Sequence, residues 1–194
     1  MPQTSNHLPP PLRYTADDLL SLPYASHYEL VAGELVERKQ ASESSCVGGR
    51  LHAMLASHVA AERLGWVFEQ DAGFQCFGDD PDEVRKPDVS FVRYDRLPDG
   101  PPQGHCRVAP DLAVEVIAPH ETYTEIETKV DEYLAAGVRL VWVVNPPNRS
   151  VRVHRPDGTV SDLRQADELA GEDVVPGFRC AVASLFAAAS DLSA

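Results

Sequence analysis

The sequence lacks any apolar run long enough to cross a bilayer, and its first residues lack the basic-then-apolar layout of a signal peptide. Its four cysteines are widely scattered, and no CxxC pair occurs, which argues against both a zinc ribbon and a dithiol redox motif. We therefore expect a soluble cytoplasmic protein with free thiols and no membrane partner. The cysteines are Cys46, Cys76, Cys106 and Cys180.

Positive charge is also scarce. The chain has 17 Lys and Arg residues against 30 Asp and Glu residues, so its formal net charge is -13. This excess of negative charge argues against an extended basic surface that binds nucleic acid, but it is compatible with a local strip of basic residues. Internal repeats and Gly/Ser-rich linkers are absent too, so the 194 residues predict one domain over 14–190, after a flexible, proline-rich arm at 1–13.

The apolar pattern predicts a mixed α/β domain. Helical spacing appears over 44–64, where Gly65 should end the helix, and over 121–136, where Gly137 should end it. Shorter helices are predicted just after Thr15 and over 184–189. Predicted strands lie at 27–31, 34–38, 66–70, 73–77, 89–92, 112–117, 140–144, 151–155, 159–163 and 178–182. This order favours a mixed β-sheet flanked by helices.

Two carboxylates interrupt strongly apolar segments. Asp88 follows Pro87 at the entry to one predicted strand, and Glu115 lies in the middle of the next. A carboxylate in such surroundings costs free energy unless something pairs with it, and a divalent cation would do so. If the two strands are neighbours, both carboxylates converge on one ion. Mg²⁺ suits such a site because it takes one or two carboxylates and keeps several waters.

A lysine on the following helix completes the candidate site. Glu125, Lys129 and Tyr133 are spaced i, i+4, i+8 and share one helix face. Lys129 near a metal-bound water would orient the nucleophile or stabilise developing negative charge. The alternative for Lys129 is a solvent-exposed pair with Glu125, and the alternative for Asp88 is an ordinary turn residue after proline.

The predicted hairpin near the N-terminus supplies two more acids. Glu34 follows the turn at Ala32-Gly33 and is our candidate for an additional metal ligand, with Glu29 as the alternative. A solvated hairpin glutamate explains either residue about as well.

These segments together resemble the Uma family of restriction endonucleases, within the PD-(D/E)xK nuclease superfamily. The resemblance covers about residues 14–186, and its order and spacing are more specific than any single piece. The matching pieces are 28–35, 86–89 (Lys-Pro-Asp-Val), 110–119, and 129–133 leading into 136–146.

The resemblance implies a restriction-endonuclease-like fold and a metal-dependent site that hydrolyses phosphodiester bonds. Asp88 would match the motif aspartate and Glu115 the (D/E) position, but Ile117 stands where the superfamily has its lysine, which Lys129 would then supply. Other departures are Ala118 in place of a frequent serine, Glu125 in place of aspartate, and Ser44-Ser45-Cys46 where a histidine often occurs.

The leading hypothesis is a Mg²⁺-dependent endonuclease acting on DNA, with Mn²⁺ as a substitute. Asp88, Glu115 and Lys129 would be catalytic, and Asp88, Glu115 and Glu34 would hold the metal. The first alternative is a non-catalytic nucleic-acid-binding or regulatory protein on a nuclease-like scaffold. The second is a hydrolase of another phosphoester, since a fold does not fix the substrate. We also expect a homodimer, because endonucleases that cut both DNA strands often use two active sites, one from each subunit.

Overall fold

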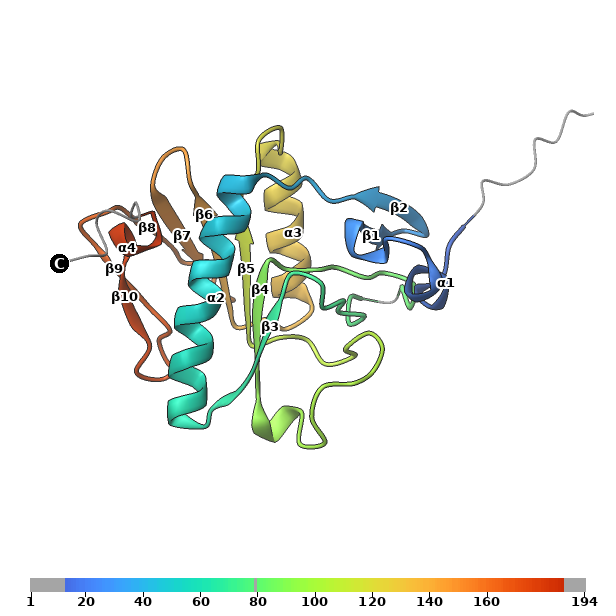
Figure 1. Ribbon diagram of the computed structural model, residues 1–194, viewed down its shortest axis with the longest axis horizontal. Coiled ribbons are helices and arrows are strands. Elements are labelled where there is room, and N and C mark those ends of the chain that lie inside the picture. The colour runs from blue at the N-terminus through green and yellow to red at the C-terminus, as the bar shows by residue number, and fades with distance from the viewer. Residues whose placement is uncertain (1–12, 79, 187–194) are drawn as a thin grey trace, which may run out of the picture.

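A six-stranded mixed sheet forms the centre of the protein, whose computed structural model describes residues 13–78 and 80–186 (Figure 1). The strand order is β3-β4-β5-β6-β7-β8, and only the β5–β6 pair is parallel. The strands are β3 (Gly65–Glu69), β4 (Val89–Arg93), β5 (Leu112–Val116), β6 (Leu140–Asn145), β7 (Ser150–His154) and β8 (Val160–Leu163). The predicted mixed-sheet fold is confirmed.

One face of the sheet is covered by helix α2 (Ser42–Glu62). Its apolar positions, Val47, Leu51, Leu55 and Val59, pack against inward residues of β4, β5 and β6. The same core includes residues of the hairpin β9 (Glu168–Ala170) and β10 (Arg179–Ala181), and of helix α4 (Val182–Leu185). This is the larger of the two cores that flank the sheet.

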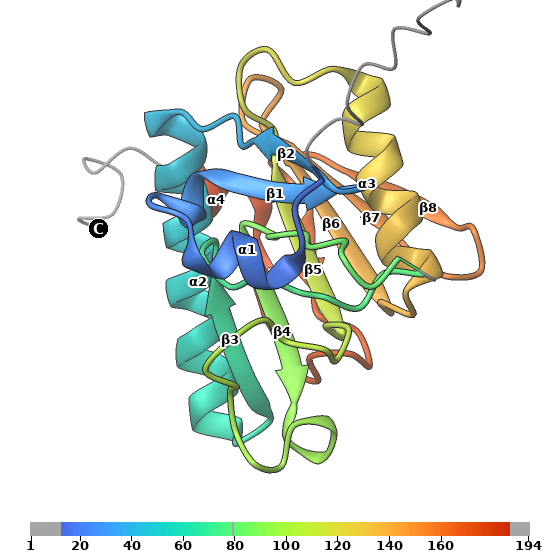
Figure 2. The ribbon, with the colours of Figure 1, turned by 90° about the vertical axis from the view of Figure 1, so that its right-hand side faces the viewer.

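The other face is covered by helix α3 (Tyr123–Ala135), which connects the parallel strands β5 and β6 (Figure 2). Thr122 begins the helix with a reciprocal capping box: its hydroxyl accepts from the Glu125 amide, and the Glu125 carboxylate accepts from the Thr122 amide. Gly137, at φ +91°, follows its last turn. Ile126, Val130 and Tyr133 face the sheet and are buried. Residues 125 and 129 therefore sit on the rim of this buried stripe.

A separate hairpin lies across one end of the sheet. It consists of β1 (Tyr28–Val31) and β2 (Glu34–Glu37), and Figure 2 shows it reaching from α2 to α3. Helix α1 (Ala16–Ser21) packs beside it around Leu19 and Leu30. Two single-turn 3₁₀ helices complete the elements, Ala25–His27 and Tyr94–Arg96. The hairpin thus closes the end of the sheet at which the candidate site lies.

Several sequence predictions need correction. Residues 73–77 are not a strand, because this segment pairs only through isolated bridges of Phe74 to Arg85 and Cys106. Gly65 does not end α2: Arg63 takes the left-handed conformation at φ +55°, and Gly65 belongs to β3. There a Cβ atom would lie 2.1 Å from the Val92 carbonyl oxygen, so the close approach of β4 requires glycine.

The ends of the chain are described only in part. The arm predicted at 1–13 lies, except for Arg13, outside the described residues, and so do the last residues of the helix predicted at 184–189. Across 13–78 and 80–186, no helix combines the length and apolarity needed to span a membrane.

Candidate active site

Asp88 lies at the entry to β4, next to β5. The antiparallel register pairs Val89 with Val114, and continuing it by one residue sets Asp88 opposite Glu115. The Asp88 amide donates to the Val114 carbonyl at 2.9 Å, and Asp88 Oδ2 accepts from the Val116 amide at 2.7 Å. Asp88 is therefore tied into the sheet and is not a free turn residue.

Arg38 provides the cation beside Asp88. It directly follows β2, and its guanidinium is almost buried, with 6% of the side chain exposed. Nη2 lies 3.1 Å from Asp88 Oδ1 and also donates to the Lys86 carbonyl, while Nη1 donates to the Gln70 carbonyl. The guanidinium thus fixes the hairpin to the segment that leads into β4.

Glu115 is buried in the middle of β5 and is held by two residues of α3. Its Oε2 accepts from Lys129 Nζ at 2.9 Å, and its Oε1 accepts from the Tyr133 hydroxyl at 2.6 Å. The protein's own groups therefore pair this carboxylate, so its burial does not by itself require a metal ion. Each oxygen still has a second lone pair for another ligand.

Lys129 is surrounded by carboxylates. Besides Glu115, its Nζ lies 3.6 Å from Glu121 Oε1 and 3.9 Å from Glu29 Oε2. Burial opposes the charged form, but the three carboxylates outweigh it and raise the pKa of Lys129 well above its usual value. The ammonium therefore stays protonated at neutral pH. It can stabilise negative charge, but it cannot act as a base.

The exposed Lys129–Glu125 pair considered from the sequence does not form. Glu125 instead accepts from Lys39 at 2.6 Å, and Lys129 turns toward the sheet with 15% of its side chain exposed. The i, i+4 spacing is compatible with a Lys129–Glu125 pair, but Glu125 pairs instead with Lys39, which is distant in sequence.

Of the two hairpin glutamates, Glu29 is the one that reaches the site. It is 2% exposed, and its carboxylate accepts from the Lys86 amide at 2.8 Å and from Arg85 at 3.2 Å. Burial alone would raise the pKa of Glu29, but Lys129 and Arg85 outweigh burial and lower it. Glu34, our predicted metal ligand, is exposed on β2, and its side chain has no hydrogen bond or ion pair within the described part of the chain.

The proximity of Glu115 contributes to a raised pKa of Asp88. Burial first, and then the negative charge of Glu115, raise the pKa of Asp88 to about 7. The Val116 amide and Arg38 offset part of this rise. Asp88 therefore holds a proton more readily than an exposed aspartate does, and a cation bound beside it would take the place of that proton.

Two cavities lead to the site. One, of about 260 Å³, lies between the hairpin and α3 and is lined by Glu29, Arg38, Glu121 and Lys129. The other, of about 210 Å³, reaches Asp88 beside the first half of α2, at Gly48. Within residues 13–78 and 80–186, no three His, Cys, Asp or Glu side chains are arranged to hold a metal.

No local sequence pattern marks Arg38, Arg85 or Glu121 as residues of the site. Arg85 is buried between Glu29 and Glu132, at 3.2 and 2.6 Å. Arg38 lies at the end of one predicted strand and Glu121 at the start of a predicted helix, and none of the three is among the predicted site residues. What identifies them is their burial around Glu29 and Lys129, which depends on how the hairpin docks.

The fold of this chain also occurs in a solved structure. A crystal structure from Anabaena variabilis ATCC 29413, described as a "putative nuclease belonging to DUF820", matches with a TM-score of 0.76 and 21% identity, over 89% of this chain and 97% of that chain. A family model described as "Uma2: Putative restriction endonuclease" matches residues 16–183. The chain belongs to the Uma2 family. A search of curated proteins finds no match.

Proposed function

We propose that this protein is a Mg²⁺-dependent nuclease that hydrolyses DNA phosphodiester bonds, with Mn²⁺ able to replace Mg²⁺. The observation that carries the proposal is the buried Glu115–Lys129 contact beside Asp88, whose pKa is raised in part by the charge of Glu115. Paired carboxylates with a fixed ammonium are the groups that metal-assisted phosphodiester hydrolysis requires. Membership of the Uma2 family supports this choice of chemistry.

The donor set suits a hard divalent cation. Asp88 and Glu115 offer carboxylate oxygens from adjacent strands, and a dication would offset the burial and the repulsion from Glu115 that together raise the pKa of Asp88. Mg²⁺ commonly takes one or two protein carboxylates and retains several waters, so Asp88 and Glu115 are enough protein ligands for it. Bound there, the ion would supply an activated water and neutralise charge on the phosphate. Of the two hairpin glutamates, Glu29 reaches this cluster, whereas Glu34 lies apart from it.

The remaining residues position these groups. Lys129, held protonated by its carboxylates, presents a positive charge to a phosphate oxygen as negative charge develops there. Tyr133 fixes the orientation of Glu115 through its hydroxyl. Glu29 from the hairpin and Glu121 from the connection between β5 and α3 also face the Lys129 ammonium.

Nicking of supercoiled plasmid with Mg²⁺ or Mn²⁺ tests the proposal. Asp88→Asn and Lys129→Met should each lower the nicking rate by a factor of about 100 or more, as losing one catalytic group usually does. Glu168→Gln is a matched control, because Glu168 is an exposed carboxylate on β9 paired only with Arg179. Nicking that survives in both site variants would refute the assignment.

One observation favours a second function. Arg38 and Lys129 already pair Asp88 and Glu115, so the site is partly neutralised without metal, as a non-catalytic nucleic-acid-binding protein would need. That function predicts no saturable Mg²⁺ or Mn²⁺ binding and no nicking, while DNA binding persists in chelator. A metal titration beside the nicking assay separates the two.

A further inference from the structure

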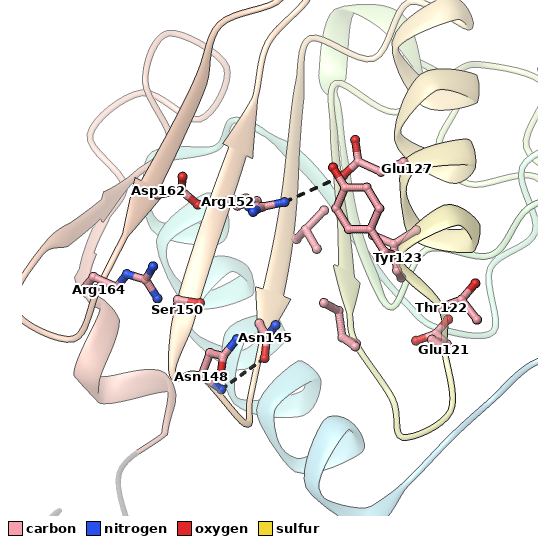
Figure 3. Close-up of a pocket in the computed structure, with 13 residues that line it drawn as sticks. Glu121, Thr122, Tyr123, Glu127, Asn145, Asn148, Ser150, Arg152, Asp162 and Arg164 are labelled. Carbon is pink, nitrogen blue, oxygen red and sulfur yellow. Dashed lines mark hydrogen bonds and ion pairs between the residues drawn. The ribbon is translucent and has the colours of Figure 1, made fainter.

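A third cavity adjoins the candidate active site. It has a volume of about 360 Å³ and lies between the start of α3 and strands β6 to β8 (Figure 3). Glu121 lines both this cavity and the one beside Lys129, and Ile117, two residues after Glu115, lies in its wall. A ligand in this cavity would therefore be next to the groups proposed to act on phosphate.

One end of the cavity presents an aromatic ring and a guanidinium. Tyr123, on the first turn of α3, is 68% exposed, and Arg152 Cζ lies 5.9 Å from the centre of its ring. Arg152 is held by Asp162 at 2.9 Å and Glu127 at 3.9 Å (Figure 3). Exposed rings and fixed guanidinium planes are surfaces on which nucleobases stack. The two carboxylates make the same end unfavourable for a phosphate.

The other end of the cavity is polar, and the Asp167 carboxylate there accepts from the Arg164 backbone amide at 2.7 Å rather than from its guanidinium. Arg164 directly follows β8, and Figure 3 shows it across the cavity from Tyr123, with Asn145, Asn148 and Ser150 between. Across 13–78 and 80–186, no carboxylate lies within 4.0 Å of the Arg164 guanidinium, in contrast to Arg152. Asn145 Oδ1 accepts from the Asn148 amide at 3.1 Å, which fixes one side-chain amide at this wall.

We propose that this cavity binds one unpaired nucleotide of the strand that the enzyme cleaves. Its base stacks against Tyr123 and Arg152, its phosphate pairs with Arg164, and the side chains of Asn145 and Asn148 form hydrogen bonds with the base or sugar. This orientation follows because Arg152 is already paired with Glu127 and Asp162, whereas no ion pair forms at the Arg164 guanidinium within residues 13–78 and 80–186. The volume is at the lower limit of small-ligand sites, so it holds one nucleotide and excludes a duplex. The proposal rests on the nuclease function proposed above.

Binding of deoxyadenosine monophosphate and deoxyadenosine, measured calorimetrically in EDTA, tests the site without any cleavage. The wild type should bind the nucleotide about ten times more tightly than the nucleoside, because only the nucleotide reaches Arg164. Arg164→Ala should remove that difference and leave nucleoside binding unchanged. Tyr123→Leu should weaken both ligands about tenfold, the usual effect of losing one stacking partner.

Two variants control for general effects on charge and exposed aromatics. Arg179→Ala removes an exposed arginine of β10, and Tyr24→Leu removes a tyrosine that is 76% exposed near the N-terminal hairpin. Both should bind like the wild type. Absence of saturable nucleotide binding in the wild type, or the same loss in variants and controls, would overturn the proposal.

Cleavage of a short single-stranded oligonucleotide distinguishes a strand site from a free-nucleotide site. Arg164→Ala should raise KM about tenfold with kcat little changed, because it removes a contact made equally before and during the reaction. An unchanged KM, or failure of the oligonucleotide to displace deoxyadenosine monophosphate, would overturn the proposal while leaving the nuclease function intact. If instead the nucleotides bind as described but no substrate is cut with Mg²⁺ or Mn²⁺, the nuclease function fails, and with it the assignment of the ligand to a cleaved strand.

Discussion

Replacing Asp88 with asparagine should remove a large pH dependence from the stability of the metal-free protein. Burial, and then the charge of Glu115, raise the pKa of Asp88 from 3.8 to about 7. A tenfold change in a proton-binding constant is worth about 1.4 kcal/mol, so this rise corresponds to about 4 kcal/mol at most. The side chain keeps 21% exposure and faces Arg38, so solvent screening leaves an expected effect of about 2 kcal/mol.

The sign follows from where the proton binds. The pKa of Asp88 is higher in the folded state than in the unfolded chain, so between about pH 4 and about pH 7 the folded protein binds the extra proton. Protonation of Asp88 therefore raises the free energy of unfolding at low pH. This contribution is lost as the pH rises through about 7. Asparagine carries no charge at any pH, so the variant should not lose this contribution.

Urea unfolding in EDTA at about pH 4 and about pH 8 measures the effect. Relative to the wild type, Asp88→Asn should gain about 2 kcal/mol in the free energy of unfolding between the lower and the higher pH. Asp162→Asn, which removes an exposed carboxylate of β8 paired with Arg152, should show little change. An equal effect of Asp88→Asn at both pH values would refute the raised pKa of Asp88 in the folded protein.

Three further outcomes follow from the same contacts. Lys129→Met should lower the free energy of unfolding by about 3–5 kcal/mol in urea titrations, because it leaves the buried Glu115 and Glu29 without their shared cation; a loss below about 1 kcal/mol would contradict this. Tyr133→Phe should cost about 1.5–3 kcal/mol, since a hydrogen bond to a buried carboxylate is lost while the ring remains; thermal unfolding indistinguishable from wild type would argue against that bond. Mg²⁺ must displace the proton from Asp88, so its affinity by calorimetry should rise about tenfold per pH unit up to about pH 7 and then level off, whereas a pH-independent affinity would place the ion elsewhere.

Local patterns were sufficient for the elements that carry the site. The apolar runs around residues 89–92 and 112–117 correspond to β4 and β5, which are adjacent. The helix predicted at 121–136 corresponds to α3, and its ends follow from Thr122 and Gly137. Strand and helix periodicities depend on neighbouring residues alone, so these predictions needed no knowledge of the topology.

The same patterns did not predict which residues are buried by contact with a different helix, strand or loop. In β1, Glu29 and its neighbour Leu30 are both buried, so the alternation that would mark one face is lost. The choice between Glu29 and Glu34 therefore depended on how the hairpin docks against Arg85 and Lys86. Residues 73–77 have a strand-like composition, but they find no continuous partner strand.

The sequence by itself determined the fold class, the position of Asp88 and Glu115 at the heart of the sheet, and the helix that bears Lys129. Only the tertiary structure decided which charges pair. These pairs are Lys129 with Glu115, Lys39 with Glu125, and Arg38 with Asp88. The physical reason is that spacing along a helix or strand sets which residues share a face. Which charges meet across 50 or more residues depends instead on the docking of separate elements, and burial then fixes those pairs.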